Sequence, residues 1–312
     1  MTHNPNDDIK KNASQRVHKP VLVQEVLTYL DPQPGNVYLD VTFGTGGHTR
    51  AILEREPTCR VIAMDWDNVV LDTFGIPMQE EFGDRLTLLW GNFALMYKIF
   101  KKENIRAVDG ILADFGTSQI QLMDRPGFSM FTDTPLDMRM SPPHQQVTAA
   151  HVLNKASGEK LREIFWQLGE ERDAKQIVFA IMEARKKKWI KTTFDLVKIV
   201  ESINPRTKKS RIHPATRVFQ ALRLYVNREL NNITAFLPMA LEFLKPEGRL
   251  VCISFHSLED RIVKTYFKEQ EDAGALEILT PRVVVGTKEE IQENASARSA
   301  KLRAAKKTLK NV

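Results

Sequence analysis

The chain has 312 residues, 42% of them hydrophobic and 27% charged, which is typical of a soluble globular protein. This length allows one large domain or two modest ones. No apolar run is long enough to span a bilayer, and the polar first residues contain no secretory signal, so we expect a cytoplasmic protein. Cys59 and Cys252 lie far apart in apolar segments, which favours buried thiols over a disulfide.

Basic residues are unevenly distributed along the chain. The formal net charge of +6 favours a polyanionic partner. Three clusters stand at 185–191, at 206–211 and in the C-terminal tail at 301–307. Any one of them is more often a solvated helix face, but three clusters, with Trp189 inside the first, favour RNA or DNA as the partner.

Short apolar runs alternate with helical patterns in the first part of the chain. The predicted strands are 37–41, 60–64, 86–90 and 109–113, and the helical stretches include 49–55 and 93–103. Near-continuous apolar strands separated by helices are typical of a parallel sheet covered on both faces. The sequence therefore predicts an α/β fold.

A loop-like segment at 114–140 ends this alternation, and the pattern then becomes helical. Helices are predicted at 159–168, 172–187, 194–202 and 214–244, the third with a capping box from Thr192 to Asp195 and the last broken at Pro238. Strand patterns return at 249–255, 276–279 and 282–285. We interpret residues 140–212 as a helical domain inserted between two parts of an α/β domain, 1–139 and 213–312.

The stretch YLDVTFGTGGH places Asp40 at the end of the first strand, followed by Gly44, Gly46 and Gly47. A strand, a glycine-rich turn and a helix allow the backbone to approach a nucleotide at the carboxyl ends of parallel strands. Asp65, at the end of the second strand, is placed to accept hydrogen bonds from ribose hydroxyls.

The loop favours one class of nucleotide. A dinucleotide fingerprint would have a third glycine where Thr49 stands, and no Gly-Lys-Ser/Thr of a P-loop follows. The Asp40 carboxylate would repel a pyrophosphate but suits S-adenosylmethionine, which has a sulfonium, an ammonium and no phosphate. The alternative is a plain tight turn in which Asp40 caps the following helix.

Asp114 ends the fourth strand, on the same side of the sheet as the glycine loop. In amino-methylating enzymes this position faces the transferred methyl group. The lone pair of an exocyclic base amine is delocalised into the ring, and a hydrogen-bond acceptor at its N–H localises that pair. The alternative is that Asp114 caps a turn.

Two other chemistries find little support. His256, Ser257 and Glu259 invite a hydrolase triad, but no GxSxG elbow is present and Ser257 follows His256 directly. No His, Cys and Asp cluster has metal-ligand spacing, so we expect no metal.

Nine motifs in consistent order closely resemble the bacterial small-subunit rRNA cytosine-N4 methyltransferase family (methyltransferase H, also called MraW). They run from His18 to Arg303 and read HKPVL, DVTFGTGGHT, DGILADFGTSQIQL, RPGFSM, PLDMRM, GEERDAKQI, HPATRVFQALRLYVNREL, SFHSLEDRIVK and NASARSAKLR. The resemblance implies a class I S-adenosylmethionine-dependent methyltransferase fold, Rossmann-like with a mostly parallel sheet, and an inserted α-helical domain. It also implies methylation of the N4 amine of one cytidine in the decoding region of 16S rRNA, within the small ribosomal subunit.

The resemblance also implies individual roles. Asp114 is the expected catalytic residue, in a direct in-line transfer without a covalent enzyme intermediate. The chain departs from the family at 117–119 and at Asp173, where the family has an aromatic residue. The implied cofactor contacts are Gly46, Gly47, His48, Asp65, Phe93, Asp114 and Gln121.

RNA contacts are expected at Arg139, Arg217 and Arg223, with the basic residues of the insert and tail binding phosphates around an everted base. A homodimer is left open. The rival functions are amine methylation of DNA, a non-catalytic RNA-binding assembly factor, and a nicotinamide dehydrogenase, which Thr49 and Asp40 disfavour.

Overall fold

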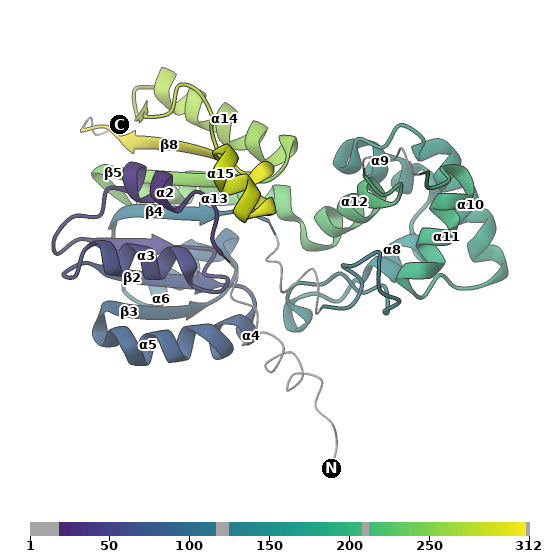
Figure 1. The fold of residues 1–312 in the computed structure, drawn as a ribbon, viewed down its shortest axis with the longest axis horizontal. Helices are drawn as coiled ribbons and strands as arrows, with labels where there is room; N and C mark the ends of the chain where they lie inside the picture. The colour runs from purple at the N-terminus through teal and green to yellow at the C-terminus, as the bar shows by residue number, and fades with distance from the viewer. Residues whose placement is uncertain (1–18, 117–124, 208–211, 310–312) are drawn as a thin grey trace, which may run out of the picture. The chain divides into compact units, whose positions relative to one another are not determined.

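The computed structural model describes residues 19–116, 125–207 and 212–309 (Figure 1). The chain forms two compact units. The first unit ends at Gly116 and resumes at Leu230, and the second consists of the residues between them. The second unit is therefore wider than the insert predicted at 140–212, because it also takes in residues of 125–139 and 213–229.

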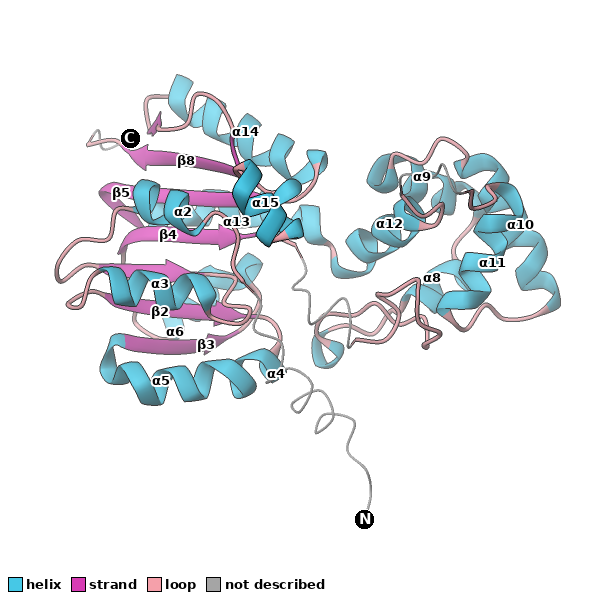
Figure 2. Cartoon of the chain, in the orientation of Figure 1, coloured by secondary structure: helices cyan, strands magenta, loops and turns pink. Residues whose placement is uncertain are grey.

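An eight-stranded sheet forms the centre of the first unit (Figure 2). The first five strands are parallel, and β8 pairs antiparallel with β5, β6 and β7. The spatial order is β3-β2-β1-β4-β5-β8-β6, with β7 paired to β8. The strands are β1 (Val37–Asp40), β2 (Arg60–Asp65), β3 (Leu86–Trp90), β4 (Val108–Asp114), β5 (Leu244–Ser254), β6 (Leu276–Ile278), β7 (Val284–Val285) and β8 (Lys301–Lys307). The predicted α/β class with a mostly parallel sheet is confirmed.

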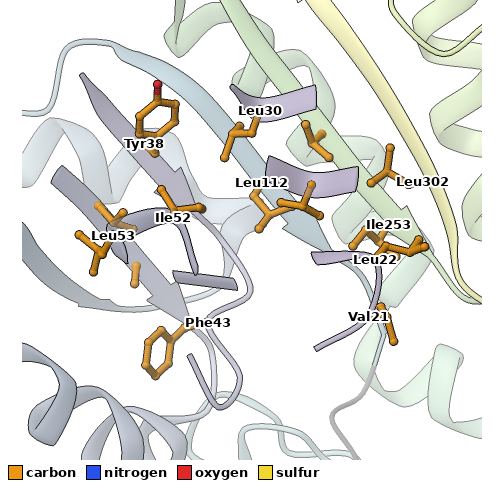
Figure 3. Close-up of a cluster of buried hydrophobic side chains, with 14 of the residues drawn as sticks. Val21, Leu22, Leu30, Tyr38, Phe43, Ile52, Leu53, Leu112, Ile253 and Leu302 are labelled. Carbon is orange, nitrogen blue, oxygen red and sulfur yellow. The ribbon is translucent and has the colours of Figure 1, made fainter. Parts of the chain in front are cut away.

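Helices cover both faces of this sheet because its strands are apolar on both sides. Tyr38 and Leu39 are neighbours in β1 and are both fully buried, but they belong to different core clusters, as the alternation along a strand requires. Figure 3 shows the cluster that contains Tyr38, to which α2 and α3 contribute Leu30 and Ile52. The helices on that face are α2 (Val23–Leu30), α3 (Gly47–Arg55) and α5 (Ile76–Phe82); those on the other are α6 (Met96–Lys102), α13 (Glu229–Phe243) and α14 (Ser257–Asp272).

Residues 301–307 form a sheet strand, so their prediction as a basic tail was wrong. Leu302 and Ala304 are fully buried, and the cations of Arg303 and Lys306 in the same strand are paired with acids. The Arg303 guanidinium lies 2.7 Å from the Asp260 carboxylate. Lys306 contacts Glu247 at 3.0 Å and Glu277 at 3.2 Å. Their acidic partners are distant in sequence, so the isolated cluster looked like free positive charge.

The second unit is helical. The Thr192–Asp195 capping box is confirmed at the start of α11. Asp173, at the position where an aromatic residue was expected, accepts a hydrogen bond from the Asn204 side chain at 2.9 Å. The helices are α8 (Ala149–Lys155), α9 (Gly158–Gly169), α10 (Ala174–Lys187), α11 (Thr193–Ile203) and α12 (Thr216–Asn227).

The stretch predicted as one helix broken at Pro238 is broken elsewhere. Pro238 lies inside α13, and the break falls at Arg228, the C-cap that follows the last residue of α12, Asn227. Arg228 has a left-handed backbone, with φ of 52°, and its N–H donates to the carbonyl oxygens of Leu224 and Tyr225. Glycine usually occupies such a position, so an arginine there left no signal in the sequence. Among the described residues, no helix has the length and hydropathy needed to cross a membrane.

Candidate active site

Three acidic residues end three adjacent strands of the sheet. Asp40 ends β1, Asp65 ends β2 and Asp114 ends β4, and β1 lies between the other two. The chain order reverses between β1 and β4, and ligands of open α/β sheets bind outside the carboxyl ends of the strands at such a reversal. The structure therefore brings the sequence-predicted acids to one edge of the sheet.

The glycine loop after β1 requires its glycines. Gly46 has φ of 80°, and a Cβ there would lie 2.5 Å from the Met78 side chain and 2.8 Å from the Phe43 ring. At Gly47 a Cβ would lie 2.7 Å from the Pro20 ring. The loop thus approaches its neighbours closely and begins α3 with backbone N–H groups that have no intrahelical acceptor.

Asp40 is held inside the loop. Its side chain is 1% exposed and accepts a hydrogen bond from the Thr49 hydroxyl at 2.7 Å. It also accepts one from the Thr42 N–H at 3.1 Å. Burial raises the pKa of the Asp40 carboxyl, while the nearby His48 side chain opposes that rise. Asp40 therefore ties β1 to α3, a role closer to the alternative capping interpretation than to a charge presented to a ligand.

Asp65 fixes the other side of the loop. One carboxylate oxygen accepts the Gly44 N–H at 2.8 Å, and the other accepts the Asp67 N–H at 2.8 Å. Burial raises the pKa of Asp65 to about 7, although both hydrogen bonds oppose the rise. A carboxylate has about four acceptor sites, so Asp65 can still accept hydrogen bonds from a diol.

Asp114 and His48 form the most unusual contact at this edge. The His48 Nε2 atom lies 3.6 Å from Asp114 Oδ2, and their side chains are 6% and 19% exposed. Asp114 Oδ1 and both ring nitrogens of His48 are buried, and no hydrogen-bond partner for them exists among the described residues. Buried polar atoms are rarely left in this way, so their partners are expected to come from a ligand or from a small rearrangement.

Thr42 is a site residue that sequence reasoning missed. Its hydroxyl oxygen accepts the Asp114 N–H at 2.7 Å, and its own N–H binds Asp40. This one residue thus links the ends of β1 and β4. A threonine two positions after a strand-ending aspartate is the pattern of an Asx turn, which could have indicated it.

Two further residues, Phe93 and Gln121, were predicted to contact the cofactor. Phe93 is half-buried and packs against Phe115 and Phe236, with ring centroids 5.9 and 5.3 Å away. Gln121 lies outside the described residues, as do the departures at 117–119. His256 and Glu259 form a capping box at the start of α14, which agrees with setting the hydrolase triad aside.

The three arginines predicted to bind RNA all lie in the second unit. Arg139 makes a bidentate contact with Asp137 at 2.7 and 2.8 Å, and Arg223 one with Glu229 at 3.0 and 3.1 Å. Arg217 is half-buried and forms no ion pair within the described ranges. Two of the three guanidinium groups are therefore already bound by carboxylates of their own unit.

Comparison with known proteins identifies the family. The model of the MraW methylase family matches residues 15–308. The chain belongs to the MraW methylase family. This MraW-family chain is 44% identical over 293 residues to the ribosomal RNA small subunit methyltransferase H of Endomicrobium trichonymphae, covering 93% of this chain and 99% of that protein. It is 42% identical to the protein of the same name from a Wolbachia of Drosophila simulans, covering 92% and 98% of the two chains. The family expected from the nine motifs is confirmed.

Proposed function

We propose that this chain is an S-adenosylmethionine-dependent methyltransferase that acts on the N4 amine of a cytidine in 16S rRNA, within the small ribosomal subunit. The observation that carries the proposal is the buried Asp114 Oδ1 without a partner, beside the glycine loop and on the same sheet edge as Asp65. The names of the relatives support rRNA of the small subunit as the substrate class. A cytoplasmic location follows from that substrate.

The loop and the strand ends fit the cofactor. The N–H groups of Gly46, Gly47 and His48 stand at the tight start of α3, Asp65 suits the ribose diol, and Phe93 offers a ring beside the adenine or the sulfonium. Gln121 and Asp114 complete the proposed set. When bound, S-adenosylmethionine would supply an electrophilic methyl group next to Asp114.

The chemistry of the site favours an amine over a ring carbon. Methylation at a pyrimidine carbon requires a thiolate nucleophile, and burial raises the pKa of Cys59 to about 11. Burial raises the pKa of Cys252 even further. Asp114 instead offers a hydrogen-bond acceptor, which localises the lone pair of an exocyclic amine and orients it for in-line transfer.

The second unit offers a nucleic-acid surface around Trp189, which is 37% exposed. The Lys155 ammonium, from the end of α8, lies 5.2 Å from the centre of the Trp189 ring. Lys187 and Lys191 are exposed and form no ion pair with any described residue. An aromatic ring among unpaired cations suits an unpaired base and its phosphates.

We keep all three arginines as proposed RNA contacts, but we expect their contributions to RNA binding to differ. Arg217 is the best placed of Arg139, Arg217 and Arg223, because it has no carboxylate partner among the described residues. Arg139 and Arg223 would have to exchange Asp137 and Glu229 for phosphate, so we expect smaller effects from their substitution.

The test uses small subunits from a strain that lacks this methylation. The enzyme is incubated with labelled cofactor and either subunits, free 16S rRNA or duplex DNA, and the modified nucleoside is mapped by mass spectrometry. We expect N4-methylation of one cytidine in the rRNA and none in DNA. A methyl group on a ring carbon or a ribose would contradict the proposal, as would undiminished activity of Asp114→Ala.

A further inference from the structure

The imidazole of His48 is a buried polar group for which the proposed mechanism has no use so far. It is 6% exposed, and neither nitrogen has a hydrogen-bond partner among the described residues. Leaving a buried donor unpaired costs about 1–3 kcal/mol in general, so such a group in a native protein calls for a physical explanation, such as a role in catalysis.

The start of α3 fixes where this ring can go. Gly47 packs against Pro20 so closely that no side chain fits between them, and the Thr49 hydroxyl is bound to Asp40 at 2.7 Å. His48 lies between these two anchored residues, and its ring is directed at the neighbouring strand end, 3.6 Å from Asp114 Oδ2. That distance is just longer than a hydrogen bond, and contacts of this kind often tighten only when ligands bind.

The two oxygens of Asp114 are in different surroundings. Oδ2 faces His48 Nε2, whereas Oδ1 is buried with no described partner. The backbone N–H of Asp114 is held by Thr42 at 2.7 Å, so the side-chain torsions are the freedom that remains. A donor on Oδ2 would remove that freedom and leave Oδ1 for the substrate.

We propose that His48 is a positioning residue that donates its Nε2–H to Asp114 Oδ2 and so aims Oδ1 at the N–H of the acceptor amine. The inference deepens the proposed amine methylation and rests on it. The His48 backbone stays with the cofactor loop, and its side chain acts only through Asp114.

In the methyl transfer, His48 neither gives up nor takes up a proton. The amine lone pair forms the new N–C bond, the pair of the broken S–C bond stays on sulfur, and one amine proton is released. Asp114 Oδ1 accepts the hydrogen bond of that N–H and receives the proton, which then passes to water. His48 Nε2–H stays in place throughout and stabilises the carboxylate before and after the step.

Two substitutions of His48 distinguish a role in positioning Asp114 from a role in packing alone. Gln places an amide N–H near the position of Nε2, whereas Leu fills part of the ring volume and donates nothing. We expect His48→Leu to lower the single-turnover rate roughly 100-fold, as small misplacements of a reacting pair do, and His48→Gln to restore most of it. His144→Gln, an exposed histidine of the second unit, is the matched control and should leave the rate unchanged.

Binding and structure supply readouts other than activity. Calorimetry with S-adenosylhomocysteine should give the same affinity for wild type, His48→Gln and His48→Leu. Crystal structures of that complex should show the Asp114 carboxylate in one orientation in wild type and in more than one in His48→Leu.

Three outcomes would overturn the inference. These are a His48→Leu enzyme as fast as wild type, a His48→Gln enzyme as slow as His48→Leu, and a loss of cofactor affinity that accounts for the whole rate defect. A wild-type enzyme that methylates a different atom would instead remove the proposed function, while the ratio between the two variants could still be measured.

Discussion

The hydroxyl of Thr42 accepts the backbone N–H of Asp114 at 2.7 Å. Because the Thr42 N–H also binds Asp40, this residue links the carboxyl ends of β1 and β4. We expect Thr42→Val to leave the Asp114 N–H unpaired and to lower the free energy of unfolding by about 1–3 kcal/mol.

Activity should fall together with stability, by roughly tenfold, because the proposed catalytic carboxylate of Asp114 loses a hydrogen bond that positions it. Thr42→Ser keeps the hydroxyl and is the control. Urea unfolding measures the stability of the two variants, and single-turnover kinetics measures their activity. If Thr42→Val equals Thr42→Ser in stability and in rate, the hydrogen bond from the Asp114 N–H to the Thr42 hydroxyl contributes to neither.

Cofactor affinity should depend on pH through Asp65. Burial raises the pKa of Asp65 to about 7, so the carboxylate that we propose accepts the ribose diol is fully formed only above that pH. The ionised form binds, so affinity should rise between pH 6 and pH 8, by about tenfold for a group that titrates within that window. Calorimetric titration with S-adenosylhomocysteine at a series of pH values between 6 and 8 measures this change in affinity.

Asp65→Asn is the control for that titration. It should bind more weakly than wild type at pH 8 and show no such rise. Burial also raises the pKa of the neighbouring Asp40, so a rise that persists in Asp65→Asn would assign the pH dependence to Asp40 instead of Asp65.

Gly46→Ala should damage the cofactor loop. Its φ of 80° is unfavourable for alanine, and the added Cβ would lie 2.5 Å from the Met78 side chain. We expect at least about a tenfold loss of cofactor affinity together with about 1–3 kcal/mol of stability. Gly35 also has a left-handed backbone, with φ of 73°, but there is open space around the position of its Cβ. Gly35→Ala should therefore lose only the stability that the strained backbone costs, and it should keep its cofactor affinity.

The Trp189 surface predicts a salt dependence. Replacing both Lys187 and Lys191 by Gln should make the slope of log affinity against log salt shallower by about 1 to 2, since each lost phosphate contact removes about 0.7 on single strands. Trp189→Ala should weaken RNA binding by about 1–3 kcal/mol without changing the slope. Filter binding with 16S rRNA measures both effects.

Lys306→Gln is the control for this surface. Lys306 belongs to a basic cluster of similar sequence, but it is paired with Glu247 and Glu277 in the sheet. The salt slope should not change. A change equal to that of the Lys187 and Lys191 variant would mean that overall charge, and not this surface, governs RNA binding.

The parallel strands and their acids were predictable because both signals are local. An apolar run that ends in an aspartate specifies a buried strand and the edge at which its carboxylate lies, and Asp40, Asp65 and Asp114 meet there as expected. The choice between the two roles considered for Asp40 was not predictable, since it depends on the Thr49 hydroxyl nine residues later in a helix whose orientation the loop sets.

Two errors have separate physical causes. The charges of Arg303 and Lys306 are neutralised by acids from other elements, and the break at Arg228 uses a backbone conformation that arginine rarely adopts. The first error depends on contacts between elements distant in sequence, and the second on a local helix cap formed by a residue type that rarely adopts it. Patterns along a chain do not contain that information.

The position of β8 has a consequence for synthesis. It lies between β5 and β6, although residues 301–307 are the last part of the sheet to leave the ribosome. Until then β5 has an open edge, and unpaired strand edges are sites of aggregation in nascent chains. A chain truncated before residue 301 would therefore be expected to aggregate and be degraded, and not to form a partly active enzyme.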